Sequence, residues 1–104
     1  MPFHLCKLLP PRPTFPADMT AEEGALMQEH AVYWMGQVRD GVAIVFGPVL
    51  DPAGVWGVAV VETADESAAR ALTEADPVIA AECGFRYDVL EMPQAVARAR
   101  AAST

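Results

Sequence analysis

The chemistry that this sequence offers centres on His30, in a stretch that reads Glu29-His30-Ala31. A histidine titrates near neutral pH and can accept or donate a proton, so His30 is a candidate general base or general acid. The plainer interpretation is a histidine packed on the inward side of a helix and hydrogen-bonded to a backbone carbonyl. Both interpretations stay open from the residues alone.

Asp76 is the candidate partner of His30. An aspartate beside a catalytic histidine orients the imidazole and stabilises its charged form. However, Asp76 directly precedes Pro77, and an aspartate before a proline is typical of a helix N-cap. Both roles hold together if one carboxylate oxygen caps the helix and the other faces a cleft. Because asparagine also caps helices well, we expect Asp76→Asn to cost little stability.

A further set of residues is expected to hold a ligand beside this pair. The guanidinium of Arg12 can bind a carboxylate or phenolate oxygen through two hydrogen bonds, whereas Arg86 fits better on a solvated strand face. Aromatic side chains, including Phe15 and Trp56, can wall a pocket, although core packing or dimer contact is their more frequent role. A glycine lets a ligand approach the backbone, or only ends a strand. The predicted ligand-binding residues are Arg12, Tyr33, Trp34, Gly47 and Pro48.

Several motifs of cofactor and metal sites are absent from the sequence. It has no phosphate-binding glycine-rich loop, no Gly-x-Ser-x-Gly and no His-Glu-x-x-His. Its two cysteines, Cys6 and Cys83, lack the spacing of a zinc site or a disulfide framework. We therefore predict no metal and no cofactor.

The charge balance limits the partners of this protein. The net charge is −7 and the pI is near 4.5, and such a field repels phosphate backbones and anionic membranes. We therefore predict neither a nucleic-acid partner nor a membrane partner. A highly anionic substrate is also disfavoured unless local arginines reverse the sign. The sequence contains no signal peptide and no membrane-spanning stretch, so a cytoplasmic location is expected.

The first 40 residues predict a strand, a stiff loop and a long helix. Residues 3–9 alternate loosely as a strand, and the four prolines of residues 10–16 favour an extended connector. Thr20 and Glu23 have the spacing of a capping box, which predicts a helix from Thr20 to about Arg39. Gly41 is the expected C-terminal cap.

A β-hairpin is predicted for residues 41–63, around the turn Asp51-Pro52-Ala53-Gly54. Its strands are apolar without alternation, unlike an antiparallel strand with one wet face. Both faces must therefore be covered, one by helices and the other by a second copy of the protein. The hydrophobic fraction of 53% also supports a buried interface.

The remaining residues complete the fold. A second helix is predicted from about Asp65 to Ala75, capped by Thr63 or Asp65, and a short helical turn opens at Asp76. Residues 85–92 alternate as a last strand. The order is ferredoxin-like β-α-β-β-α-β, an α+β fold with an antiparallel sheet and helices on one face, and two copies would form a dimeric α+β barrel. Residues 1–93 form the domain and residues 94–104 an Ala/Arg tail.

This ordered set of residues resembles the YciI-related (YCII) domain family. The matching elements span about residues 3–92 and are Glu29-His30 with Tyr33, Gly41, Phe46-Gly47-Pro48, Asp65-Glu66 and Asp76-Pro77. The resemblance implies a dimeric ferredoxin-like barrel with a His–Asp active site. It also implies a family in which most members lack an assigned reaction, one known role being the dehydrochlorination of a chlorinated hydroxyhydroquinone.

The leading hypothesis is a cofactor-independent small-molecule enzyme of the lyase or isomerase type. His30 would shuttle the proton, Asp76 would orient it, and Arg12 with the aromatic residues would hold an anionic or phenolic ligand. Three other classes stay open: a non-catalytic dimeric module that binds a metabolite, a cofactor-free oxygenase on the same barrel, and a purely structural dimer without a pocket for a ligand. The distance between His30 and Asp76 separates catalysis from simple packing.

Overall fold

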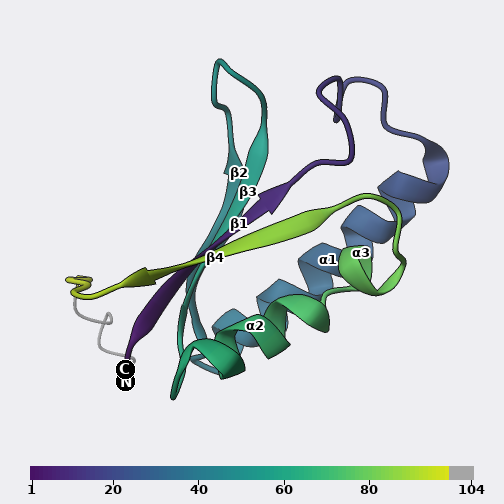
Figure 1. Ribbon diagram of the computed structural model, residues 1–104. Helices are drawn as coiled ribbons and strands as arrows, with labels where there is room; N and C mark the ends of the chain where they lie inside the picture. The colour runs from purple at the N-terminus through teal and green to yellow at the C-terminus, as the bar shows by residue number, and fades with distance from the viewer. Residues whose placement is uncertain (99–104) are drawn as a thin grey trace.

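The structure, a computed structural model, describes residues 1–98 of the chain. Its elements follow the predicted order, with the short helical turn as a third helix (Figure 1). Residues 99–104, the end of the predicted Ala/Arg tail, lie outside the described residues. The elements are β1 (Phe3–Leu9), α1 (Ala21–Arg39), β2 (Ala43–Val49), β3 (Trp56–Glu62), α2 (Glu66–Glu74), α3 (Pro77–Ala80) and β4 (Arg86–Met92).

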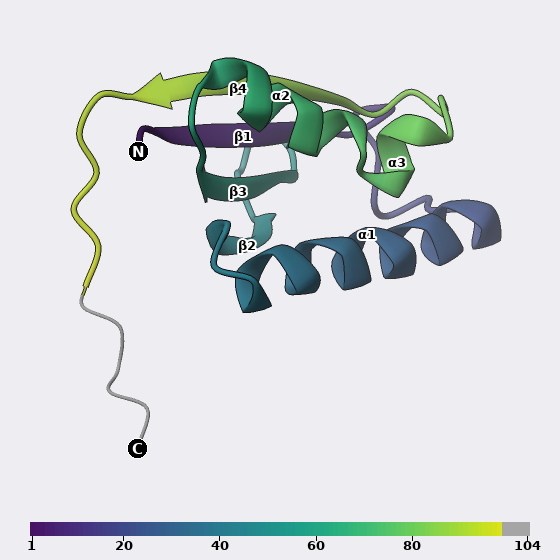
Figure 2. The same cartoon turned by 90° about the horizontal axis from the view of Figure 1, so that it is seen from below.

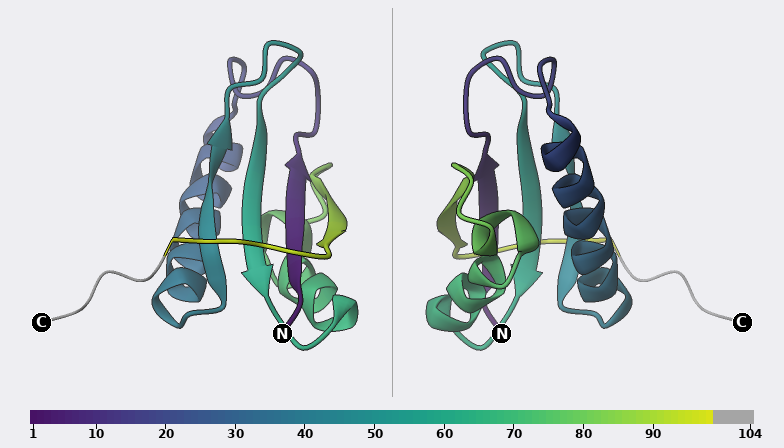
Figure 3. Two further views of the ribbon diagram at one scale, coloured as in Figure 1. Left: turned by 90° about the vertical axis from the view of Figure 1, so that its left-hand side faces the viewer. Right: turned by 90° about the vertical axis from the view of Figure 1, so that its right-hand side faces the viewer.

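The four strands form one antiparallel sheet in the order β2-β3-β1-β4. The helices cover one face of this sheet and leave the other face without a helix (Figures 2 and 3). The predicted ferredoxin-like α+β fold is therefore confirmed. No helix within residues 1–98 combines the length and the apolarity that crossing a membrane requires.

The alternation along β1 decides which side chains meet the helices. His4, Cys6 and Leu8 are buried, whereas the residues between them are only half-buried. The register pairs Cys6 with Ala59 of β3 and with Val89 of β4, so these three side chains share the helix-covered face. The main core cluster consists of Cys6, Trp34, Ala43, Ala59, Val61, Ala69 and Val89.

The face without helices is apolar as well. Leu5 of β1 pairs with Val60 of β3 and with Leu90 of β4, and Val45 of β2 pairs with the other side of Val60. This row crosses the whole sheet, and its outer members are widely exposed, Val45 at 50% and Leu90 at 55%. The hairpin strands thus carry apolar residues on both faces, as their lack of alternation predicts.

Local signals in the sequence account for the helix ends. The predicted capping box of α1 is present, with the Thr20 hydroxyl accepting from the Glu23 N–H and the Glu23 carboxylate accepting from the Thr20 N–H. Gly41 follows α1 with a φ of 80°, in the left-handed region that favours glycine. Helix α2 is capped by Asp65, whose side chain accepts from the Ala68 N–H. Of the two predicted caps for α2, Asp65 is therefore the one used.

The β2–β3 hairpin turns at the predicted residues. The N–H of Gly54 donates to the carbonyl of Asp51 at 2.9 Å, and the Asp51 side chain accepts from the Ala53 N–H. The other carboxylate oxygen of Asp51 accepts from the indole N–H of Trp56 at 3.1 Å. The turn therefore holds Trp56 at the end of the sheet, where it borders the same cavity as Phe15 and Pro16.

Candidate active site

His30 and Asp76 meet in the fold. One turn of α1 brings His30 and Trp34 to the same side of the helix, and that side faces inward. Trp34 is fully buried, and the side chain of His30 is 13% exposed. Nδ1 of His30 lies 2.7 Å from Oδ2 of Asp76. The helix α1 and the turn between α2 and α3 thus bring the predicted pair into hydrogen-bond contact.

Asp76 uses its two carboxylate oxygens for different purposes. Oδ1 accepts from the N–H of Val78 at 3.1 Å and caps α3. Oδ2 contacts Nδ1 of His30 and accepts from the indole N–H of Trp34 at 2.9 Å and from the hydroxyl of Tyr87 at 2.6 Å. The whole residue is buried, with 0% exposed. The N-cap role and the role as partner of the histidine, alternatives in the sequence, therefore coexist.

The donors around Asp76 assign the protons of the site. The indole N–H of Trp34 also lies 3.1 Å from the hydroxyl oxygen of Tyr87, so this oxygen accepts from Trp34 and its own proton points to Asp76. An ionised carboxylate only accepts hydrogen bonds, and Nδ1 of His30 is accordingly the nitrogen that carries a proton. In the neutral imidazole this leaves the lone pair on Nε2, which makes no hydrogen bond within residues 1–98.

The electrostatics keep Asp76 charged and Tyr87 protonated. Burial disfavours the charged form of Asp76, but the hydrogen bonds from His30, Tyr87 and Trp34, together with attraction to His30, outweigh burial and lower its pKa. Burial, the charge of Asp76 and the hydrogen bond to it raise the pKa of Tyr87 well above its ordinary value. At neutral pH, His30 therefore sits against a fixed carboxylate anion.

A cavity of about 250 Å³ lies beside His30. It is open to solvent on one side and is lined by α1, by the loop of residues 10–19, by the ends of β1, β2 and β3 and by residue 85 before β4. Among residues 1–98, its wall is apolar apart from His30, which is the one titratable side chain of this part of the chain that lines it. Aromatic and methionine residues make up much of the lining, namely Phe15, Met19, Met27, Phe46, Trp56 and Phe85.

A second, much smaller space of about 10 Å³ shares His30, Phe46 and Gly47 with this cavity. Trp34 and Tyr87 also line it. Its volume is about that of one water molecule's probe sphere. The smaller space is thus bordered by Trp34 and Tyr87, two of the residues that contact Asp76.

The structure brings part of the predicted ligand-binding set to these spaces. Gly47 and Pro48 line the larger cavity, and Trp34 lines the smaller space. Tyr33 lines neither, because its hydroxyl donates to the carbonyl of Leu72 at 2.6 Å and its ring packs against the core. For Tyr33, the core-packing alternative therefore holds.

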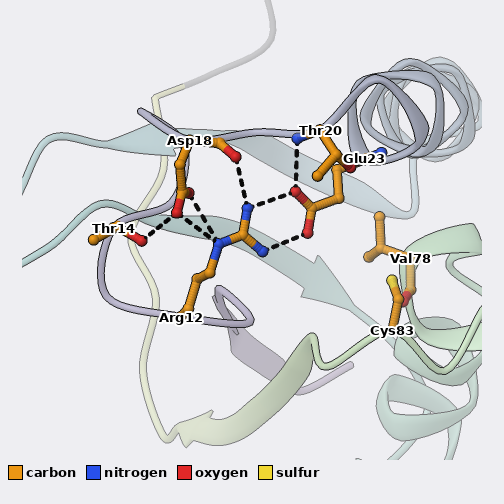
Figure 4. A network of polar contacts seen from close by, with 7 residues as sticks. All are labelled: Arg12, Thr14, Asp18, Thr20, Glu23, Val78 and Cys83. Carbon is orange, nitrogen blue, oxygen red and sulfur yellow. Dashed lines mark hydrogen bonds and ion pairs between the residues drawn. The ribbon is translucent and has the colours of Figure 1, made fainter.

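Arg12 belongs to a network of polar contacts with Asp18 and Glu23 that does not include His30 (Figure 4). Two guanidinium nitrogens bind the two carboxylate oxygens of Glu23 at 2.7 Å each, and the remaining contacts at 2.9 Å go to Asp18. The hydrogen bond from Arg12 is the main cause that lowers the pKa of Glu23 to about 2. The guanidinium is thus hydrogen-bonded to two carboxylates that are close to it in sequence. Arg12 does not line the cavity. Its expected role as a ligand-binding residue is not supported; it fixes the loop that carries Phe15.

The remaining candidates from the sequence divide between surface positions and positions beside the cavity. Arg86 is exposed on β4, as a solvated strand residue would be. Phe15 and Trp56 are among the residues that line the cavity. Within residues 1–98, no group of three or more His, Cys, Asp or Glu side chains is arranged to hold a metal ion.

Tyr87 is the member of the hydrogen-bond network around Asp76 that sequence reasoning missed. Its alternation with Asp88 on the last strand predicts only that it points inward. A buried tyrosine needs a partner for its hydroxyl, and that requirement is the signal that could have connected Tyr87 to a buried aspartate. Met19, Met27 and Phe85 were missed as cavity residues because each reads equally well as ordinary core.

Comparison with known proteins identifies a family whose model matches most of this chain. The model of the YCII-related domain matches residues 8–93 of the chain. The matched span contains His30, Asp76 and Tyr87, and it runs from β1 to the end of β4. A search of the curated proteins finds no match.

Proposed function

Because the chain belongs to the YCII-related domain family, and because His30 contacts a buried aspartate at the wall of an apolar cavity, we propose that it is a cofactor-independent enzyme of the lyase or isomerase type. His30 moves the proton, and Asp76 orients the imidazole. The observation that carries the proposal is the 2.7 Å contact between Nδ1 of His30 and Oδ2 of Asp76. Of the residues that the structure describes, His30 is also the one titratable group in the cavity wall.

The step begins at Nε2 of His30, which takes a proton from a carbon or oxygen of the bound molecule. The electron pair of the broken bond forms a new double bond in the substrate. In an isomerase the proton returns to a different atom, and in a lyase a leaving group departs with its electron pair. The imidazolium that forms is stabilised by the Asp76 carboxylate, as in other His–Asp pairs. Such acid–base catalysis contributes about 10²–10⁴-fold to a rate.

The cost of the buried carboxylate favours this role over simple packing. Capping α3 requires only one oxygen of Asp76, and a charge buried this deeply is expensive unless it is paired and hydrogen-bonded. The second oxygen nevertheless has three partners, His30, Trp34 and Tyr87. Titratable groups with shifted pKa values beside a cavity are common at functional sites.

The partner of the open sheet face is, in our proposal, a second copy of the same chain. The row from Val45 through Val60 and Leu5 to Leu90 crosses that face, and Val45 and Leu90 are half exposed or more. Contiguous exposed apolar surface of this kind is typical of a protein–protein interface. A two-fold pairing of the same face on itself satisfies both copies at once.

Proton exchange in heavy water tests the catalytic proposal. The protein is incubated with cyclohexanone in D₂O, and the replacement of hydrogen by deuterium next to the carbonyl is followed by proton NMR. We expect the wild type to accelerate this exchange and His30→Gln to slow it by about 100-fold or more. Glu29→Gln, an exposed neighbour on the same helix, is the matched control and should exchange like the wild type.

Equal exchange rates for the wild type and His30→Gln would contradict the proposed role of His30. The absence of any acceleration by the wild type would also count against acid–base catalysis. In that case a cavity that still binds small molecules would identify the protein as a binding module.

A further inference from the structure

Within the described part of the chain, the wall of the 250 Å³ cavity offers only one polar side chain for a ligand to engage, His30, since the indole N–H of Trp56 is already donated to Asp51. We propose, on the basis of the proposed function, that the ligand is an uncharged, fragment-sized molecule with an apolar body and a single hydrogen-bonding group aimed at Nε2 of His30. This ligand class differs from the anionic or phenolic ligand that Arg12 would have favoured.

No cationic side chain of residues 1–98 lines the cavity. Arg12 is engaged by Asp18 and Glu23, and the ammonium of Lys7 lies 4.6 Å from the ring centre of Trp56 as a cation–π contact. The others lie on exposed surface, namely Arg39, Arg70, Arg86 and Arg98. An anionic ligand would therefore lose its hydration without gaining a fixed positive partner.

The surroundings of the cavity make an anion still less favourable. The carboxylate of Asp76 lies directly behind His30, and its pKa is lowered by the surrounding hydrogen bonds, so it stays charged at neutral pH. The whole chain also carries a net charge of −7, which repels anions on approach.

A cationic ligand is disfavoured for a different reason. No carboxylate of residues 1–98 lines the cavity, and Oδ2 of Asp76 is already occupied by three donors and inaccessible. The aromatic rings of the wall could attract a cation, but desolvating an ammonium group in an apolar space remains costly. An uncharged molecule avoids the desolvation cost that an anion or a cation would have in this cavity.

The volume of the cavity and the residue types that line it limit the size and the chemical character of the ligand. A volume of about 250 Å³ is below the roughly 300–1,000 Å³ of ligand pockets in general, which suits a molecule built around one ring. Phe15 and Phe85 stand edge to face with ring centres 5.3 Å apart, and the thioethers of Met19 and Met27 adapt to irregular shapes. An aromatic or alicyclic body packs well against such a wall.

Three probes of nearly equal size test the charge preference: benzyl alcohol, benzoate and benzylammonium, each at neutral pH. The chain has two tryptophans, so its indole N–H groups give two NMR signals, one from Trp34 beside Asp76 and one from Trp56, a residue that borders the cavity. We expect benzyl alcohol to shift the Trp56 signal and to bind at least tenfold more tightly than either charged probe. Equal or tighter binding of benzoate or of benzylammonium would overturn the proposal, and so would the absence of binding by all three.

A pair of neighbouring variants locates the binding. Ala31→Leu adds bulk inside the cavity, whereas Val32→Leu adds it on the outer side of α1, where Val32 is 65% exposed. We expect Ala31→Leu to weaken benzyl alcohol binding at least tenfold and Val32→Leu to leave it unchanged; equal affinities in the two variants would show that the probe binds elsewhere. These binding measurements do not depend on turnover, so a failure of proton exchange and a failure of charge preference are separate results.

Discussion

The hydroxyl of Tyr87 donates a hydrogen bond of 2.6 Å to Oδ2 of Asp76. This is the same oxygen that contacts Nδ1 of His30, so a strand residue and a helix residue converge on one buried atom. The sequence contains a second tyrosine in a different setting, because the hydroxyl of Tyr33 donates to a neutral carbonyl, that of Leu72, also at 2.6 Å. The two tyrosines therefore form a matched pair for measuring what the charge of Asp76 adds.

Tyr87→Phe should destabilise the protein more than Tyr33→Phe does. A hydrogen bond to a charged group contributes about 1.5–3 kcal/mol, against about 0.5–1.5 kcal/mol for a neutral one. The measurement is the free energy of unfolding from denaturant titration of the wild type and both variants. Equal losses in the two variants would mean that Tyr87 does not donate to an ionised Asp76.

Asp76→Asn should be strongly destabilising, contrary to what the N-cap alone suggests. The carbonyl oxygen of an asparagine can serve either the Val78 N–H or the donors at Oδ2, but not both. The NH₂ group of the asparagine, itself a donor, would then face other N–H or O–H donors. Each buried group left without a hydrogen bond costs about 1–3 kcal/mol. The loss is expected to exceed about 2 kcal/mol in the free energy of unfolding.

Asp65→Asn is the matched control for this change. Asp65 caps α2 through one side-chain oxygen and is exposed, so asparagine should replace it at little cost. If both variants lost the same small amount of stability, the three-donor arrangement at Asp76 would be refuted.

The stability of the wild type should fall as the pH drops from about 4.5 towards 2, in part through Glu23. Its pKa is lowered from 4.5 to about 2, mainly by the hydrogen bond from Arg12. A lowered pKa in the folded state contributes stability above the unfolded value, and this contribution is lost as the pH falls through the folded value. Glu23→Gln should therefore flatten the pH dependence in this window. Glu22→Gln, which changes an exposed residue of the same turn, should keep the slope of the wild type.

Leu90→Lys should convert a dimer into a monomer if the open sheet face is the interface. Leu90 is 55% exposed in the single chain, so the lysine should not disturb the fold of the monomer, but two lysines would be brought into an apolar contact. Val32→Lys changes a residue of similar exposure, 65%, on the helical side. Analytical ultracentrifugation of the three proteins at micromolar concentration distinguishes them. A monomeric wild type, or a Leu90→Lys variant that remains dimeric, would contradict the proposed interface.

Local signals in the sequence determined the elements of this protein and their order. The capping box of Thr20 and Glu23, the turn at Asp51 and the cap at Asp76 depend on residues within a few positions of one another. The alternation of the strands determined which side chains face inward, and the hairpin without alternation indicated an apolar open face. Such short-range patterns act before any tertiary contact and can be recognised without one.

Only the tertiary structure decided which of the candidate residues act together. Arg12 looked free to bind a ligand, but Asp18 and Glu23 compete for it once the loop folds back on α1. Tyr87 looked like core, yet its hydroxyl completes the hydrogen bonds of Asp76. Contacts between residues far apart in sequence depend on the positions of helices relative to the sheet. No local pattern encodes those positions, and the charge and shape of the cavity follow from them.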